Sequence, residues 1–290
     1  MSSLTITLIQ TNLQWEDKAA NLAMLQKKIS AIKEKTEVVV LPEMFTTGFS
    51  MRPALYAETM QGETIEWMKN IAASNNIILT GSVIIEEEHK YFNRLIWMQP
   101  NGEYGYYDKR HLFAHGDEHL YYTPGNKRLI ASVKGWKINL QVCYDLRFPV
   151  WARQSPISAR EKNIGAETAP LSTPWRGAGS EEYDVLLYVA NWPERRINAW
   201  KTLLQARAIE NQCYVIGVNR IGNDGNNIYH TGDSMVVNAM GEILYHKTHK
   251  EEIFTITLQK DELEETRNKL PFLKDADNFF ISDPPAFFNE

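Results

Sequence analysis

The sequence has few cysteines, no long hydrophobic run and no excess of basic residues. Only two cysteines occur in 290 residues, too few for the disulfide framework of a secreted chain. No apolar run approaches the length of a membrane span, and the N-terminus lacks the pattern of a signal peptide. A net charge of −5 provides no basic field for nucleic acid or anionic membrane. We therefore expect a cytoplasmic protein with reduced thiols and neither a nucleic-acid nor a membrane partner.

The overall composition is that of an ordinary globular protein with a hydrophobic core. Hydrophobic residues make up 43% of it and charged residues 23%. Neither an internal repeat nor a composition break is visible, so we predict a single domain over residues 1–290 of the α/β class, with layers of sheet and helix. Alternation and short apolar runs predict strands at 4–9, 37–41, 76–84, 95–98, 104–107, 129–133, 137–142, 183–189, 213–218, 234–237 and 253–258. Helical spacing predicts helices at 19–32, 64–74 and 197–208, with a last one beginning near Asp261.

Two stretches do not fit a compact core. Residues 155–182 are rich in Ser, Pro, Gly and charge and are longer than most loops of compact domains, which indicates an insertion or a lid. The tail at 270–290 mixes several phenylalanines with acidic residues. Because so many aromatic rings are unfavourable in water, we expect this tail to pack on the domain or on a partner subunit.

The strongest functional signal is a cysteine at the end of a predicted strand. Cys143 follows the apolar run at 136–142, and polar turn residues come directly after it. A thiol at the rim of a sheet is accessible to a substrate, but it attacks a carbonyl carbon only as the thiolate. Glu43, which follows the buried-type strand at 37–41 and Pro42, is a candidate general base. Lys109 and the backbone N–H of Tyr144 are candidate donors to an oxyanion. Cys213, within another apolar strand, is expected to be a core residue.

These segments resemble the nitrilase, or carbon–nitrogen hydrolase, superfamily. The matching motifs are Leu41-Pro42-Glu43, Asp108-Lys109 followed by His111-Leu112-Phe113, and Cys143-Tyr144-Asp145 followed by Arg147-Phe148-Pro149. The resemblance covers residues 4 to about 258 and is greatest to the ω-amidase branch, whose features match Ala190-Asn191-Trp192-Pro193, Trp200, the run at 206–211 and Thr231-Gly232-Asp233-Ser234.

The resemblance implies a fold, a substrate class and further site residues. The implied fold is a four-layer αββα sandwich that associates through helices into a homodimer or a larger homo-oligomer. Glu118 is expected to orient Lys109 and the substrate amide, and Arg147 is a candidate for binding the substrate carboxylate. The implied substrates are small ω-amides of α-keto acids, 2-oxoglutaramate and 2-oxosuccinamate, and no cofactor is implied. The span 155–182 is an insertion relative to shorter relatives, which bears on substrate specificity.

Other interpretations remain open at this stage. The same chemistry serves N-carbamoyl amino acids and aliphatic amides. His111, His115 and His119 recur at a spacing that zinc sites use on a helix, but Gly116 interrupts the segment, and we predict no metal. A metal-dependent phosphodiesterase on another four-layer sandwich and a non-catalytic protein of the same fold are the remaining alternatives. The intact set of glutamate, lysine and cysteine argues against the non-catalytic alternative. We expect Arg207 and Glu210 to form a structural ion pair.

Overall fold

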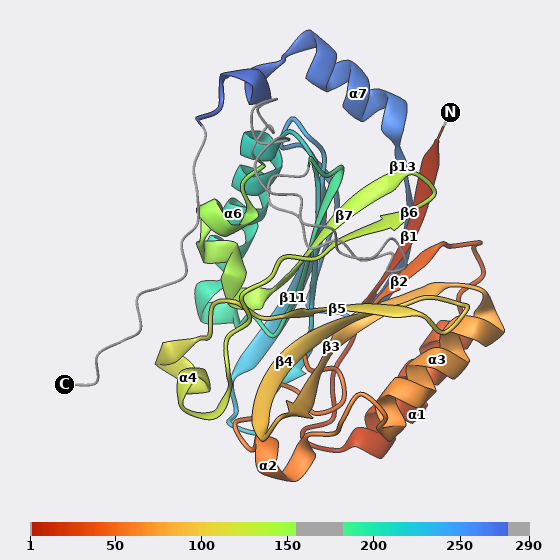
Figure 1. The fold of residues 1–290 in the computed structure, drawn as a ribbon, viewed down its shortest axis with the longest axis vertical. Helices are drawn as coiled ribbons and strands as arrows, with labels where there is room; N and C mark the ends of the chain where they lie inside the picture. The colour runs from red at the N-terminus through yellow and green to blue at the C-terminus, as the bar shows by residue number, and fades with distance from the viewer. Residues whose placement is uncertain (1, 155–181, 278–290) are drawn as a thin grey trace, which may run out of the picture.

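The computed structural model describes residues 2–154 and 182–277, which form two β-sheets between layers of helices (Figure 1). The six-stranded sheet has the order β13-β1-β2-β3-β4-β5. Its strands are β1 (Ser3–Gln10), β2 (Val38–Val40), β3 (Ile78–Glu87), β4 (Lys90–Met98), β5 (Tyr104–Asp108) and β13 (Glu252–Gln259). Strands β1, β2 and β3 are parallel, whereas β13, β4 and β5 join by antiparallel pairing. The strands predicted at 95–98 and 104–107 are confirmed and pair with each other as β4 and β5.

The second sheet has seven strands, in the order β10-β11-β9-β8-β7-β6, with β12 also paired to β11. Its strands are β6 (Ile130–Val133), β7 (Trp136–Val142), β8 (Val185–Ala190), β9 (Tyr214–Asn219), β10 (Ile221–Asn223), β11 (Tyr229–Val237) and β12 (Ile243–Thr248). Strands β7, β8 and β9 are parallel at its centre. Each sheet therefore has a parallel core whose strand ends can carry functional loops.

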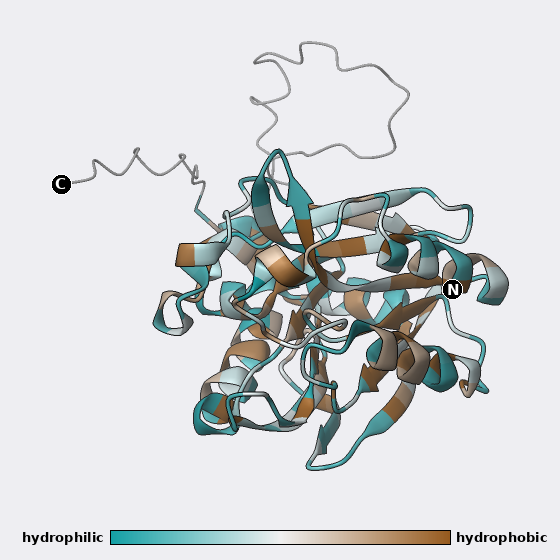
Figure 2. Ribbon diagram, turned by 90° about the horizontal axis from the view of Figure 1, so that it is seen from below, coloured by the Kyte–Doolittle hydropathy of each residue, from teal (hydrophilic) through white to brown (hydrophobic). Residues whose placement is uncertain are grey.

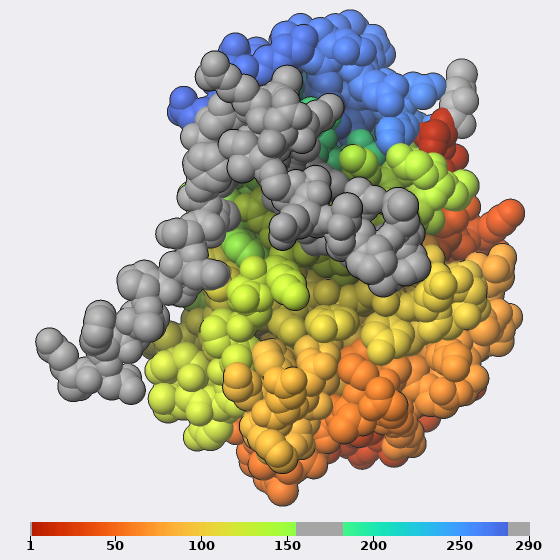
Figure 3. Space-filling model, viewed as in Figure 1, coloured from red at the N-terminus to blue at the C-terminus, as the bar shows by residue number. Residues whose placement is uncertain are grey.

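Helices cover the outer face of each sheet. On one side lie α1 (Lys18–Ser30) and α3 (Glu63–Asn75), and on the other lies α6 (Ile197–Asn211), as Figure 1 shows. The short helices are α2 (Pro53–Tyr56), α4 (Glu118–Tyr121), α5 (Pro149–Ala152) and the 3₁₀ turns η1 (Ala114–Gly116), η2 (Cys143–Arg147), η4 (Glu194–Arg196) and η5 (Phe272–Asp275). The last helix, α7 (Lys260–Lys269), lies beside the N-terminal strand at one end of the molecule (Figure 3). The predicted four-layer αββα sandwich is confirmed.

Alternation along β1 illustrates how the sequence builds these layers. Leu4, Ile6 and Leu8 belong to the core between the two sheets, whereas Ile9 packs with the helix layer. Successive side chains of a strand point to opposite faces, so a central strand buried on both sides contributes to two cores. Each fully buried aliphatic side chain contributes about 1.5–3 kcal/mol to folding. Hydrophobic segments accordingly concentrate inside the ribbon and hydrophilic ones at its rim (Figure 2).

The helix layer on the second sheet, formed by α6, packs very closely against strand β9. Gly217 lies in β9 beneath α6, and a Cβ atom there would lie 2.6 Å from Trp200 and 2.7 Å from Leu204. Glycine lets the helix pack against the strand with both of these side chains fully buried. The predicted core position of Cys213 and the predicted ion pair of Arg207 with Glu210 are confirmed; the pair has an N–O distance of 2.9 Å.

Several strand predictions were incomplete. Strand β4 begins at Lys90 rather than Leu95, and it forms a long hairpin with β3. The charged residues around its turn are typical of a loop, which hid the first half of the strand. Strand β12 was missed because it lies at an edge and most of its side chains are exposed, so the hydrophobic signal there is weak.

The remaining predictions on domain organisation concern two segments, residues 155–182 and the tail at 270–290. Apart from Glu182, the predicted insertion or lid at 155–182 lies outside the described residues, as do residues 278–290 of the tail. Within the described part of the tail, the Leu270 carbonyl oxygen accepts a hydrogen bond of 2.7 Å from Gln212 Nε2. The organisation as a single domain stays a prediction. No helix of the described residues is long and apolar enough to cross a membrane.

Candidate active site

Loops at the carboxyl ends of strands from both sheets meet at one place. Glu43 follows β2, Lys109 follows β5 directly, Cys143 follows β7 directly, and Asn191 follows β8 directly. Parallel strands place these ends at the same edge, so side chains far apart in the sequence converge. The sequence predicts a site with Cys143 at the rim of a sheet. The structure brings Glu43, Lys109, Cys143 and Glu118 together at this edge.

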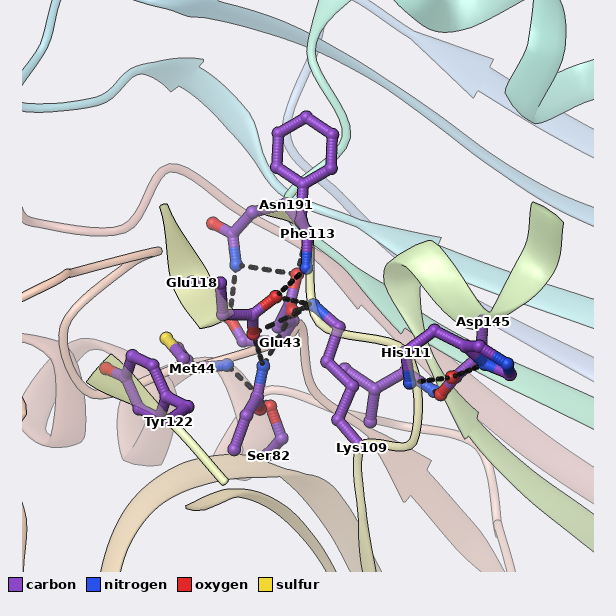
Figure 4. A network of polar contacts seen from close by, with 12 residues as sticks. Glu43, Met44, Ser82, Lys109, His111, Phe113, Glu118, Tyr122, Asp145 and Asn191 are labelled. Carbon is purple, nitrogen blue, oxygen red and sulfur yellow. Dashed lines mark hydrogen bonds and ion pairs between the residues drawn. The ribbon is translucent and has the colours of Figure 1, made fainter. Parts of the chain in front are cut away.

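The Lys109 ammonium lies between two carboxylates, all three fully buried (Figure 4). Lys109 Nζ donates hydrogen bonds to Glu43 Oε1 at 3.0 Å and to both oxygens of Glu118 at 3.0 and 2.9 Å. Burial alone would lower the pKa of Lys109, but the charges of Glu118 and Glu43 raise it above its ordinary value. Lysine is therefore a permanent cation at neutral pH, held in place by two anions.

Glu118 is fixed by further donors. The backbone N–H of Phe113 donates to Glu118 Oε2 at 2.6 Å, which ties α4 to the loop after β5. Burial raises the pKa of Glu118, the ammonium of Lys109 opposes this, and the charge of Glu43 adds to it. The two carboxylates and one ammonium therefore form a strongly coupled group.

Two asparagines orient Glu43. Asn93 Nδ2 donates to Glu43 Oε1 at 2.8 Å and to Glu118 Oε1 at 3.2 Å. The backbone N–H of Asn191 donates to Glu43 Oε2 at 2.7 Å, and Asn191 Nδ2 donates to the Glu43 carbonyl oxygen at 2.7 Å. Both carboxylate oxygens of Glu43 therefore have fixed partners, which leaves its orientation with little freedom.

Cys143 opens the turn η2 with an unusual backbone conformation. Its φ is +45°, in the left-handed region that non-glycine residues rarely adopt and that often occurs at functional sites. The residue is 8% exposed. Burial raises the pKa of the Cys143 thiol well above its ordinary value; the negative charge of Glu43 raises it further, while Lys109 lowers it. At neutral pH the thiol keeps its proton and needs a base to remove it.

A second buried network joins the cysteine turn to the lysine loop. Asp145 Oδ2 accepts from Tyr107 Oη at 2.8 Å and from the backbone N–H of Val142 at 3.1 Å. Asp145 Oδ1 accepts from the backbone N–H of His111 at 2.9 Å, and His111 Nδ1 lies 2.8 Å from the same oxygen. The His111 ring stacks on Phe148. Asp145 thus connects the residues on either side of Lys109 to the strand end that carries Cys143.

Above the cysteine lies a cavity of about 180 Å³. Cys143, Tyr144 and Arg147 are all in its wall, so the predicted oxyanion and substrate residues face the same space as the nucleophile. The ring of Tyr144 packs edge-on against Phe113 and Phe148. The other lining residues are Phe49, Met51, Phe113, His115, Gly116, Asn191, Trp192, Pro193, Arg195, Arg196, Asp224, Asn226, Ile228 and His230.

The histidines of the loop after β5 do not act as one group. His111 pairs with Asp145, whereas His115 contributes to the cavity wall. Within residues 2–154 and 182–277, no three side chains of the His, Cys, Asp and Glu types are arranged to hold a metal ion.

The carbon-nitrogen hydrolase family model matches residues 5–268. This chain belongs to that family. The expectation of an amide-hydrolysing enzyme, made from the three motifs, is thereby confirmed.

Similar proteins extend over nearly the whole of this carbon–nitrogen hydrolase. It is 42% identical to "Omega-amidase YafV" of Escherichia coli, over 96% of this chain and 99% of that protein. It is 29% identical to the "2-oxoglutaramate amidase" of Bacillus subtilis, over 93% and 96% of the two chains. Among solved structures, a CN-hydrolase superfamily protein from Xanthomonas campestris matches with a TM-score of 0.87 and 41% identity, covering 97% of this chain and 100% of that one.

Sequence reasoning missed the roles of three residues in this carbon–nitrogen hydrolase's site. Asn93 was not singled out, although it lies two residues before the apolar run at 95–98, where a polar side chain can be buried with the strand. Asn191 was noted only as part of a motif, with no role. Asp145 was quoted in the same way, and its contacts to Tyr107 and His111 depend on the tertiary structure. Hydrogen bonds between separate strands leave no periodic trace in the sequence.

Proposed function

We propose that this chain is an ω-amidase that hydrolyses the terminal amide of an α-keto acid such as 2-oxoglutaramate. The observation that carries the proposal is the position of the Cys143 thiol in the wall of a cavity, next to the Glu43 and Lys109 pair. The names of the Escherichia coli and Bacillus subtilis relatives support the substrate class.

In the first half-reaction Glu43 takes the proton of the Cys143 thiol as the sulfur attacks the amide carbon. The tetrahedral oxyanion is stabilised by the Lys109 ammonium and the backbone N–H of Tyr144. Glu43 then gives the proton to the amide nitrogen, the carbon–nitrogen bond breaks, and ammonia leaves a thioester on the cysteine. Because the pKa of the Cys143 thiol is raised, the thiol is protonated at neutral pH and a neighbouring base has to remove its proton.

In the second half-reaction a water molecule attacks the thioester. Glu43 accepts a proton from this water and returns it to the sulfur as the carbon–sulfur bond breaks. The products are the dicarboxylic α-keto acid and the free thiol of Cys143. Glu118 serves in both halves by holding Lys109 in place through its two hydrogen bonds of 3.0 and 2.9 Å, and we assign it the orientation of the substrate amide.

The test is ammonia release from 2-oxoglutaramate by the wild type and by Cys143→Ala, each with and without EDTA. We expect release by the wild type, loss of release in the variant and no effect of the chelator. Absence of release by the wild type, while iodoacetamide still modifies Cys143 rapidly, would refute the ω-amidase assignment and direct attention to N-carbamoyl amino acids and aliphatic amides.

We also propose that the chain forms a homodimer or a larger homo-oligomer through the α6 side. Exposed apolar side chains there support this: Ile209 on α6 is 54% exposed and Met240, in the neighbouring β11–β12 turn, is 52% exposed. The hydrogen bond of 3.0 Å from Gln205 Nε2 to the Gly241 carbonyl oxygen joins these two elements. Sedimentation analysis of the wild type and of Ile209→Glu tests the assembly, and the cytoplasmic location stays a prediction.

A further inference from the structure

The active-site cavity has an excess of positive charge at one side. Arg195 and Arg196, both on η4, and Arg147 on η2 all line the cavity that contains Cys143. Asp224 is the one acidic residue among the described residues of this wall. Three cations gathered around a small cavity repel one another, and an anion bound among them would relieve that repulsion.

The guanidinium groups are held by aromatic rings rather than by carboxylates. The Arg196 guanidinium lies 4.8 Å from the centre of the Phe113 ring, and that of Arg147 lies 5.1 Å from the centre of the Trp192 ring. Within the described part of the chain, neither arginine forms an ion pair. Stacking on a ring leaves the N–H groups in the guanidinium plane available for a bidentate contact with a carboxylate.

Arg196 is the best placed of the three. It is half-buried, whereas Arg195 and Arg147 are exposed. Burial lowers the pKa of Arg196, and the neighbouring charges of Arg195 and Arg147 lower it further, while a Cys143 thiolate would raise it. All three arginines and Cys143 line the same cavity, so the Arg196 guanidinium lies in a common electrostatic environment with the other two cations and the reacting sulfur. Arg196 also precedes the first residue of α6, where no side chain caps the helix, so the positive end of the helix dipole acts in the same direction.

We infer that Arg196, assisted by Arg195, binds the carboxylate of the substrate and thereby selects amides that carry an anionic group at the far end. This inference rests on the proposed function and adds the residues that confer its specificity. It differs from the sequence prediction, which pointed to Arg147 alone. A charge-assisted contact contributes most where water is partly excluded, and this favours the half-buried Arg196 over its exposed neighbours.

The test compares two reagents that differ in one charge: 5-bromo-4-oxopentanoate and its methyl ester. In the acid, the carboxylate carbon is as many bonds from the brominated carbon as the carboxylate of 2-oxoglutaramate is from its amide carbon. Each reagent alkylates Cys143: the sulfur–carbon bond forms, bromide leaves and Glu43 takes the thiol proton. The readout is the ratio of the two alkylation rates, acid over ester, followed by mass spectrometry.

For Arg196→Gln we expect this ratio to fall about tenfold or more, with the rate for the ester unchanged within about twofold. Arg196→Lys should recover part of the ratio, because it keeps the charge but not the bidentate geometry. Lys201→Gln is the matched control: it removes one positive charge from α6 outside the cavity lining, and it should leave the ratio unchanged.

The outcomes separate this inference from the proposed function. An unchanged ratio in Arg196→Gln, or a fall in Arg147→Gln alone, would overturn the inference even if 2-oxoglutaramate is hydrolysed. A fall in the ratio without any hydrolysis of 2-oxoglutaramate would support the anion site and refute the ω-amidase assignment. If both hold, KM for 2-oxoglutaramate should rise in Arg196→Gln with a smaller change in kcat.

Discussion

Replacing Asp145 by asparagine should weaken both the fold and the reactivity of Cys143. The Asp145 carboxylate is fully buried and joins the loop of Lys109 to the strand end that carries Cys143. In the variant one of its two oxygens becomes an NH₂ group that faces donors. One side of the carboxylate accepts from the backbone N–H and ring of His111, and the other from Tyr107 Oη and the backbone N–H of Val142.

The magnitude follows from the number of donors that lose an acceptor. Whichever oxygen is replaced, a backbone N–H and a side-chain group lose their acceptor. Each buried unpaired donor costs about 1–3 kcal/mol, so the loss of two acceptors should lower the free energy of unfolding by about 2–6 kcal/mol. Val142 directly precedes the nucleophile, and a displacement of about 1 Å at a reacting group lowers the rate about 100-fold.

The assay combines urea denaturation with the rate of Cys143 modification by iodoacetamide. Asp184→Asn is the matched control, because Asp184 is 6% exposed and accepts hydrogen bonds of 2.9 Å from the Lys137 N–H and from Lys260 Nζ. Asp184 directly precedes β8, whereas the active site lies at the other end of this strand, where Asn191 follows it. The control should lose stability but keep its modification rate; an Asp145→Asn protein that is destabilised yet modified at the wild-type rate would refute a positioning role.

Three further predictions concern the site and the cavity wall. Asn93→Ala removes the donor shared by Glu43 and Glu118, and steady-state kinetics should show kcat reduced about 10- to 1000-fold with little change in KM; an unchanged kcat would contradict the role given to Asn93. Glu118→Gln removes one of the two anions that neutralise Lys109 and should lower kcat by a similar factor, whereas Glu63→Gln, on the surface helix α3, should not. His230 is neutral in the folded protein, because burial and the Arg220 cation lower its pKa from 6.5 to about 4. In the unfolded chain His230 is protonated below pH 6.5, whereas in the folded protein it stays neutral down to about pH 4. As the pH falls from 6.5 to 4, the free energy of unfolding should therefore fall by roughly 3 kcal/mol. His230→Gln should lack this part of the pH dependence in urea denaturation, while the exposed His89→Gln should retain it.

Three residues of the site were predictable because their signal is local. Cys143, Glu43 and Lys109 each follow a segment whose sequence predicts a strand. A thiol, a carboxylate and an ammonium together form a set of groups able to cleave an amide. Periodicity likewise determined most of the strands and helices, since burial on one or two faces imposes a period on the sequence.

The tertiary structure alone decided which groups complete the site. Asn93 and Asn191 reach Glu43 from other strands, and His111 pairs with Asp145 rather than with the histidines nearest to it in sequence. The cationic side of the cavity exists because η4 and η2, from different parts of the chain, face the same space. Contacts of this kind depend on how the sheets pack and on strand order, and packing of distant segments leaves no periodic pattern in the sequence.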